Sequence, residues 1–511
     1  MHRCLQITEI FSAILSAVPA HGSFKREGKK STYASVARTC KLFYEPAMDA
    51  AWAILPDIVP LVASLPGDSW AKSDDGEILI VRPPEGDEWQ RFLRNAARVE
   101  KLSLQGSKSA TNILRAARLG VSTSTNPFSG LRDLILKDID LEQASYLPVI
   151  LNSSLRSVWI MKCPYIATNA LLGHLGHLCP TIEVFHALSI PSGASGVLLH
   201  FTSLKQLTCR NGMELTPTIL SHLSSLPMLE TFTNSLPNMR SIAGVHSLTA
   251  FKFLRSLHLF EITDHPTLLL LLKSIHPTSL SSLELSAASQ PLPNIANMTE
   301  LLIAISRFTT LQLLNINLNF RYENQDDEPI GYSILPLHTL RDLRHITLRN
   351  VPVSIDDQSI HLLGKAWPNL KKLDFSSYST GAHHVTKLTL AALGLFATYF
   401  PQLGHVAIAL DATSPPSTTG LEPRSSRPIN LFIEASPLDE RTWPDVAAYI
   451  SAVYPKAYDY KRSIFSGARN DGRWTDIIRL VPVLARARRE EEQRVRSSLR
   501  AEESQCADSD Q

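Results

Sequence analysis

The 511-residue sequence has little net charge and no long apolar run. Its 50 Lys and Arg residues almost balance 48 Asp and Glu residues, so the formal net charge is only +2. No overall electrostatic field therefore favours nucleic acid or a membrane surface as a partner. The longest leucine run, residues 268–272, is far too short to cross a bilayer. These absences leave other proteins as the expected partners.

Cysteines are few, and they are scattered without paired spacing. The six are Cys4, Cys40, Cys163, Cys179, Cys209 and Cys506. This pattern favours free thiols in a reducing compartment over a disulfide framework. The first twenty residues carry Arg3 and an apolar stretch, as secretory signals do, but Gln6 and Glu9 interrupt the stretch. We therefore expect an intracellular protein in the cytoplasm, the nucleus or both.

Motifs that hold phosphates or activate nucleophiles are also missing. The sequence contains no GxxxxGK[ST], GxGxxG or GxSxG pattern. His174, His177 and Cys179 are close in sequence, but no second ligand group lies near them, so packing is favoured over metal binding. We expect no enzymatic activity, no cofactor and no metal.

A short apolar pattern, LxxLxL, recurs along most of the chain. Twelve such cores start between residues 99 and 403, about 28 residues apart on average. They begin at Val99, Leu131, Leu155, Ile182, Leu204, Leu229, Leu254, Leu280, Leu311, Leu343, Leu370 and Leu403. The pattern resembles that of leucine-rich-repeat proteins.

The stretches between the cores predict helices. Their leucines recur at three and four residues, as in TPTILSHLSSLP from Thr216. Several stretches end at a proline just before the next core, namely Pro180, Pro227, Pro277, Pro368 and Pro401. The resemblance implies an α/β fold, in which stacked units form a horseshoe-shaped solenoid with a parallel concave sheet and outer helices.

The third, fifth and seventh positions of each core should face solvent on the concave side, because the first, fourth and sixth point inward. Most of these positions are polar, such as Gln206, Thr208 and Arg210, or Lys372, Asp374 and Ser376. Units two to four instead present Ile135, Trp159, Met161, Val184, His186 and Leu188. An exposed apolar cluster around a tryptophan is typical of a protein-binding site. The alternative is that another segment covers it as ordinary core.

Residues 4–18 and 33–55 precede the array and resemble an F-box, a small all-α module that binds a Skp adaptor. The segments read CLQITEIFSAILSAV and YASVARTCKLFYEPAMDAAWAIL. The resemblance assigns adaptor contacts to Leu5, Ile7, Glu9, Ile10, Ile14, Val36, Cys40, Phe43, Pro46 and Trp52. It places Val36, Cys40 and Phe43 on one helix face. Thr8 departs from the usual proline, and the alternative is that this segment only caps the array.

A bridging segment, residues 77–104, resembles the linker of F-box and leucine-rich-repeat families of mushroom-forming fungi. A short strand, an Arg-Pro-Pro turn and a D-x-W-x-R-F helix carry the likeness. The residues are Arg82, Pro83, Pro84, Trp89, Arg91 and Phe92. Buried aromatic side chains there should fix the angle between the two modules.

These patterns divide the chain into six parts. They are the F-box-like module (1–55), a junction (56–98), the repeat array (99–410), a disordered Pro/Ser loop (411–428), a divergent final repeat (429–484), and a charged helix end with a disordered tail (485–511).

The resemblance implies a substrate-recognition subunit of an SCF-type ubiquitin ligase, which would bind the Skp adaptor, the cullin scaffold and an unknown target. The alternative is a leucine-rich-repeat interaction scaffold without ligase association. No nucleic-acid or membrane partner is expected.

Overall fold

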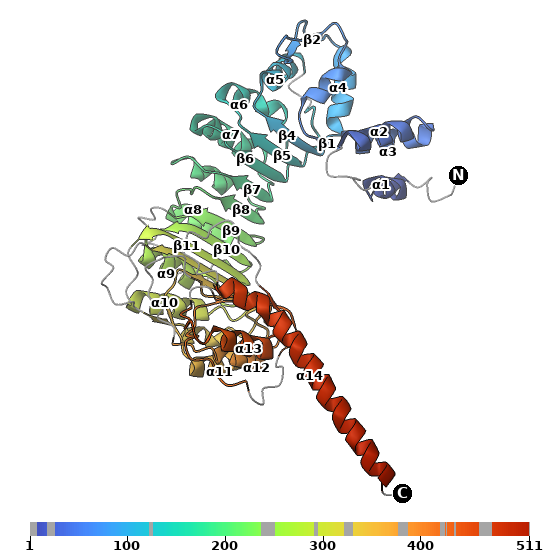
Figure 1. Cartoon of the computed structure of the whole chain (residues 1–511). Coiled ribbons are helices and arrows are strands. Elements are labelled where there is room, and N and C mark those ends of the chain that lie inside the picture. Colours follow the sequence, from blue (N-terminus) through green and yellow to red (C-terminus); the bar gives the residue numbers. More distant parts are fainter. Residues whose placement is uncertain are drawn as a thin grey trace. The chain divides into compact units, whose positions relative to one another are not determined.

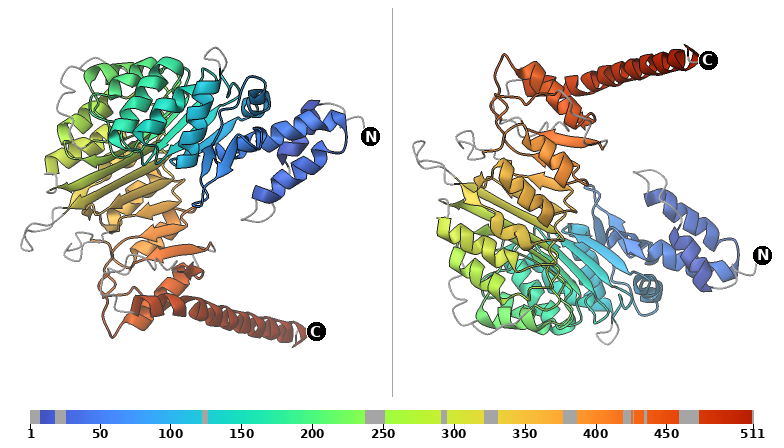
Figure 2. Two further views of the ribbon diagram at one scale, coloured as in Figure 1. Left: turned by 90° about the horizontal axis from the view of Figure 1, so that it is seen from above. Right: turned by 90° about the horizontal axis from the view of Figure 1, so that it is seen from below.

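The computed structural model describes residues 8–17, 26–121, 126–236, 251–290, 295–320, 331–376, 387–418, 425, 427–433, 436–458 and 473–509. The chain forms two compact units, Met1–Ser235 and Leu236–Gln511, which are described separately (Figures 1 and 2). Leu5 and Ile7 lie outside the described residues, as do residues 419–424 of the expected Pro/Ser loop.

The first unit contains a sheet of seven strands whose order follows the chain. Neighbouring strands pair in parallel along it. The strands are β1 (Ile54–Leu55), β4 (Lys101–Gln105), β5 (Asp133–Lys137), β6 (Ser157–Met161), β7 (Val184–Ala187), β8 (Gln206–Cys209) and β9 (Thr231–Ser235).

Helices connect these strands and lie together along one side of the sheet (Figure 1). They are α5 (Lys108–Gly120), α6 (Leu141–Tyr146), η3 (Leu147–Val149), α7 (Tyr165–Leu178), η4 (Ser195–His200) and α8 (Pro217–Ser225). Polar side chains fix where two of these helices begin. At α5 the Ser107 hydroxyl accepts a hydrogen bond from the Ala110 amide, and at α6 Asp140 and Gln143 form a capping box.

The second unit repeats this plan with eight parallel strands. They are β10 (Ser256–Ile262), β11 (Ser282–Gln290), β12 (Leu313–Phe320), β14 (His345–Arg349), β16 (Lys372–Asp374), β17 (His405–Ala407), β18 (Ile429–Phe432) and β19 (Ala457–Tyr458). A separate pair joins β13 (Tyr332–Ser333) to β15 (Val353–Ser354). The helices are α9 (His265–Ser274), α10 (Ile295–Ser306), η5 (Leu335–Thr339), α11 (Asp357–Ala366), α12 (Ala392–Tyr399), α13 (Trp443–Val453) and α14 (Arg473–Ser509).

The repeated apolar pattern explains both sheets. Each of the twelve cores gives one strand, and every strand begins at the third position of its core. The first, fourth and sixth positions of all twelve are buried, at most 7% exposed. One unit alone could not bury these side chains, whereas stacking in register makes a continuous core. The expected α/β leucine-rich-repeat arrangement is therefore confirmed within each unit.

The backbone is left-handed at the eighth core position of several repeats. Asp138, Lys162, Glu261 and Asn350 occupy this position with φ between 51° and 55°. Gly106 holds it in the first repeat, where an added Cβ would lie 2.0 Å from the Asp138 carbonyl oxygen. This close approach requires glycine there.

A junction precedes β4 in the first unit. It contains η2 (Val59–Ser64), the antiparallel pair of β2 (Trp70–Lys72) and β3 (Ile78–Ile80), and α4 (Glu88–Ala97). Arg82 forms ion pairs with Asp68 at 3.1 Å and Glu88 at 2.9 Å. The buried Trp89 indole donates to the Pro84 carbonyl at 2.9 Å and packs edge-on against Phe92. The aromatic pair expected in this segment thus lies in the core of the junction.

Two expectations for the second unit differ from its structure. Asp374 and Ser376, at the fifth and seventh positions of one core and expected in solvent, are both buried. The Asp374 carboxylate lies 2.9 Å from the Arg349 guanidinium and accepts a 2.6 Å hydrogen bond from the Ser376 hydroxyl, which offsets the cost of burial. In addition, α14 continues to Ser509 through most of the segment expected to be disordered.

Candidate protein-binding surfaces

The N-terminal three-helix module consists of α1 (Thr8–Ala17), α2 (Arg26–Ala37) and α3 (Lys41–Trp52). Its small core contains Phe11, Leu15, Tyr33, Ala37 and Ala47. The Phe11 ring stacks on Phe43 with centroids 4.2 Å apart, and the Tyr33 hydroxyl donates to the Leu15 carbonyl at 3.2 Å. The module therefore has its own core.

A neighbouring face of α1 presents apolar side chains to solvent. Ile10 is 40% exposed and Ile14 is 44% exposed, although Phe11 and Leu15, one residue further along, are buried. Residues four apart lie on the same face of a helix, so the two isoleucines form one apolar ridge. Glu9 is exposed next to them.

The remaining residues predicted to contact the adaptor are divided between two helices. Val36 lies near the end of α2, Cys40 is the extended residue before α3, and Phe43 is in the first turn of α3. The expected single helix is thus interrupted, because the Thr39 amide and hydroxyl both bond the Val36 carbonyl. Pro46 is buried within α3.

Two exposed apolar residues of α3 were not identified from the sequence. Leu42 is 47% exposed and Tyr44 is 45% exposed, on either side of the half-buried Phe43. The sequence does contain an indication of them: Leu42 and Tyr44 do not share the helix face that Phe43 and Ala47, four residues apart, turn towards the core. Trp52, at the end of α3, is only half-buried.

Polar contacts attach this module to the sheet of the first unit. The Ala53 carbonyl accepts hydrogen bonds from the amides of Glu100 (2.9 Å) and Lys101 (2.8 Å), immediately before β1 pairs with β4. The Arg98 guanidinium pairs with the carboxylates of Glu45 and Asp49 on α3. The module is therefore held directly against the first strands.

A second surface lies on the sheet, on the side opposite its helices. The parallel register places Ile135, Trp159 and His186 side by side on β5, β6 and β7. The indole of Trp159 stacks on the His186 imidazole at 4.3 Å and 22°, and its ring nitrogen donates to the Ser157 hydroxyl at 3.2 Å. The structure thus brings the central three predicted residues together.

The other three predicted residues border this row. Val184 lies two residues before His186 and is half-buried, while Met161 is 39% exposed and Leu188 is 37% exposed. Trp159 itself is 37% exposed. We call the six residues the Trp159 patch: Ile135, Trp159, Met161, Val184, His186 and Leu188.

The electrostatic environment keeps the middle of the patch uncharged. Burial lowers the pKa of His186, and the positive charge of Arg210 lowers it further. The imidazole is therefore neutral at pH 7 and acts with Trp159 as a flat, largely apolar platform.

No protein-family model matches the chain, and no curated protein matches it. An internalin from Listeria monocytogenes is one similar solved structure, 15% identical, with a TM-score of 0.39; the match covers 80% of this chain and 94% of that one. A leucine-rich-repeat protein of Leptospira interrogans is 14% identical, with a TM-score of 0.35 and coverage of 69% and 88%. The assignment rests instead on the strand register and the periodic buried side chains. This is a leucine-rich-repeat fold.

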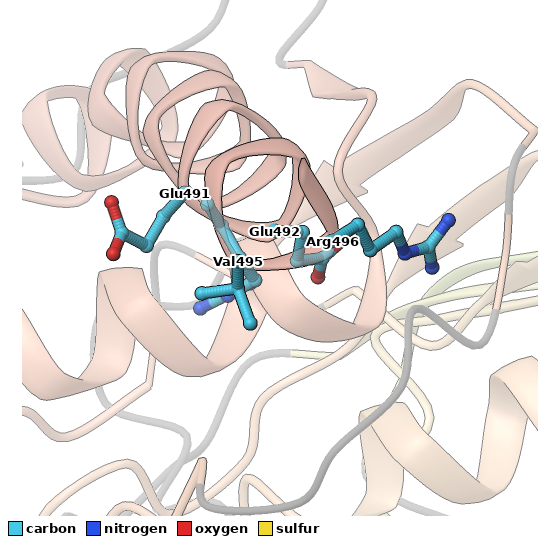
Figure 3. Close-up of a pocket in the computed structure, with 5 residues that line it drawn as sticks. Glu491, Glu492, Val495 and Arg496 are labelled. Carbon is cyan, nitrogen blue, oxygen red and sulfur yellow. The ribbon is translucent and has the colours of Figure 1, made fainter. Parts of the chain in front are cut away.

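Other sites on the leucine-rich-repeat chain offer less chemistry. Within the described ranges, no group of three His, Cys, Asp or Glu side chains is arranged to hold a metal ion. Burial raises the pKa of Cys179 to about 11, so this thiol stays protonated at neutral pH. No described helix combines the length and apolar character needed to span a membrane. A shallow hollow on α14 is lined by Arg488, Glu491, Glu492, Val495 and Arg496, all from one helix (Figure 3).

Proposed function

We propose that this leucine-rich-repeat protein is the substrate-recognition subunit of an SCF-type ubiquitin ligase. The three-helix module binds a Skp adaptor, which joins it to a cullin scaffold, and the Trp159 patch binds the target protein. The chain contributes position and no catalytic group of its own. It acts in the cytoplasm or the nucleus.

The apolar ridge of Ile10 and Ile14 carries the adaptor assignment. Its two side chains are exposed on a helix whose neighbouring face already fills the module's core. A helix with this arrangement gains free energy by docking its exposed apolar face against a partner. The F-box resemblance of the same residues supplies the identity of that partner.

The attachment of the module to the sheet supports a positional role. The Ala53 carbonyl bonds and the Arg98 ion pairs join α3 to β4 and α4. A target held on one part of a firmly connected unit stays at a high effective concentration near whatever is bound to the other part. Ubiquitin transfer could then be accelerated without a reactive side chain in this protein.

Co-purification with the Skp adaptor tests the proposal. The tagged full-length chain should retain the adaptor, and the double variant Ile10→Glu/Ile14→Glu should lose it, because two carboxylates on the ridge oppose apolar contact. Ser12→Glu is the matched control: Ser12 is exposed on the same helix, about 200° around the axis from both isoleucines. Circular dichroism should show equal helix content in all three proteins.

If the wild-type chain does not retain the adaptor, the ligase assignment fails. The alternative is then a leucine-rich-repeat interaction scaffold without ligase association.

A further inference from the structure

A row of four side chains runs along one edge of the Trp159 patch: the middle two belong to the patch, and a basic residue lies at each end. Lys137 ends β5 and pairs in register with Met161 of β6. Leu188 comes next, since its amide bonds the Ile160 carbonyl, and Arg210 lies beside Leu188, whose carbonyl accepts from the Asn211 amide. The order across the four repeats is therefore basic, apolar, apolar, basic.

The two basic ends lack acidic partners within the part of the chain that the structure describes. Neither Lys137 nor Arg210 forms an ion pair with a described carboxylate, and Arg210 is exposed. Lys205 on the same sheet is different, because its ammonium lies 2.6 Å from the Glu183 carboxylate. The positive charges at the ends of the row thus remain available to a ligand.

Asp133 shows that the charge is asymmetric across the patch. It lies at the opposite end of β5 from Lys137, four residues earlier. A negatively charged ligand therefore meets attraction along the edge with Lys137 and Arg210, whereas at the opposite edge Lys101 pairs in register with Asp133 and the two charges offset each other. This difference favours a single position for the ligand.

The spacing of the row sets the spacing of a matching ligand. Lys137 and Arg210 are separated by three intervals between strands, about 14 Å at about 4.8 Å each. An extended peptide advances about 3.3 Å per residue, so about four residues span this distance. The side chains between its ends would lie over Met161, Leu188 and the Trp159 platform.

We propose that the Trp159 patch binds an extended acidic peptide segment of the target protein, with two carboxylate side chains about four residues apart and an apolar side chain between them. The carboxylates pair with Lys137 and Arg210, and the apolar side chain packs on Trp159. The inference rests on the proposed function only in taking this patch as the target-binding surface.

Selection from a displayed library of random dodecapeptides on the immobilised full-length chain tests this inference. Bound peptides should be enriched in Asp or Glu at two positions about four apart, with an aromatic or aliphatic residue between. The selected peptide, labelled with a fluorophore, should bind the double variant Lys137→Glu/Arg210→Glu roughly tenfold more weakly. The control Lys72→Glu/Lys108→Glu changes the net charge equally at exposed positions of the same unit, on β2 and at the start of α5, and should bind as the wild type does.

Selection of uncharged or basic peptides, or of none above background, would overturn the inference. Equal binding by the two double variants would overturn it as well. Thermal unfolding at the same temperature in both variants excludes misfolding as the cause of a difference. The assay contains no adaptor, so its failure is distinguishable from failure of the adaptor assignment.

Discussion

The indole of Trp159 lies 4.3 Å from the imidazole of His186, with the two ring planes inclined by only 22°. Parallel register produces this stack, because β6 and β7 pair these two residues directly. The rings lie on an open sheet face and leave more than a third of the Trp159 side chain in solvent. Rigid aromatic surfaces of this kind lose little conformational entropy on binding.

Replacing Trp159 should therefore affect binding more than folding. Trp159→Ala should reduce affinity for the selected peptide by at least about tenfold, whereas the free energy of unfolding of the first unit should fall by only about 1 kcal/mol. The comparison is Trp367→Ala, in which a fully buried indole that donates to the Leu337 carbonyl is lost. That change should cost about 3–5 kcal/mol. Fluorescence anisotropy measures the peptide affinity, and thermal unfolding measures the stability. Unchanged peptide affinity in Trp159→Ala would contradict the expected role of this side chain in binding.

The sequence was sufficient to predict the twelve strands of the repeat cores, but not short strands such as β1, β2 and β13. In each LxxLxL core the fourth and sixth residues point to one face, as alternate side chains of a strand do. All twelve strands begin at the third position of their core. The cluster of Ile135, Trp159 and His186 followed from the same count, since equivalent positions of successive repeats become neighbours.

Other features depended on interactions that no local pattern specifies. Asp374 occupies a nominally exposed position, but its burial depends on Arg349 from the preceding strand. The break between α2 and α3 arises from one hydroxyl, that of Thr39, which competes for a backbone carbonyl. The length of α14 reflects side-chain pairs such as Arg486 with Glu490 at 2.9 Å, which support a helix in a polar segment.

The pKa of His186 offers a second measurement on the patch. It should titrate below 6.5, its ordinary value, because burial is the main cause and Arg210 adds to it. The unfolded chain therefore binds this proton more readily than the folded chain does. The contribution of His186 to the free energy of unfolding is lost as the pH falls below 6.5, and the loss is complete below the lowered pKa.

Histidine-selective NMR can follow this titration, with His186→Gln to assign the signal. Arg210→Ala should raise the midpoint part of the way towards 6.5, because the larger cause, burial, remains. Lys101→Ala should leave it unchanged. A wild-type midpoint at or above 6.5 would contradict the expected environment.

Helix α14 should divide into a part that folds the second unit and a part that does not. Trp474, Ile477 and Val481 are buried, and the Trp474 indole donates to the Ser436 carbonyl at 3.1 Å. Residues 490–500 are exposed. A chain ending at Arg489 should therefore unfold at nearly the same temperature as the full chain, while Ile477→Ala should cost about 2–5 kcal/mol. A large loss of thermal stability in the shortened chain would show that the outer part of α14 has contacts of its own.

The ion pair of Asp374 predicts acid sensitivity in the second unit. Burial raises the pKa of this carboxyl, but the Ser376 hydrogen bond and the Arg349 charge outweigh it, so the pKa lies below 3.8. The folded state therefore binds this proton less readily than the unfolded chain, and the resulting stability is present above pH 3.8 and lost as the pH falls through the lowered pKa.

Asp374→Ala should destabilise the unit by about 3 kcal/mol at pH 7, since it leaves the Arg349 guanidinium without its buried partner. The difference from the wild type should narrow as the pH approaches the lowered pKa, where the wild-type carboxyl also becomes neutral. Asp342→Ala, at an exposed turn of the same unit, is the control and should have little effect at either pH. Denaturant unfolding at several pH values measures the free energy of unfolding of each protein. If the difference between Asp374→Ala and the wild type stayed constant with pH, the side chain would stabilise the unit by its shape and not by its charge.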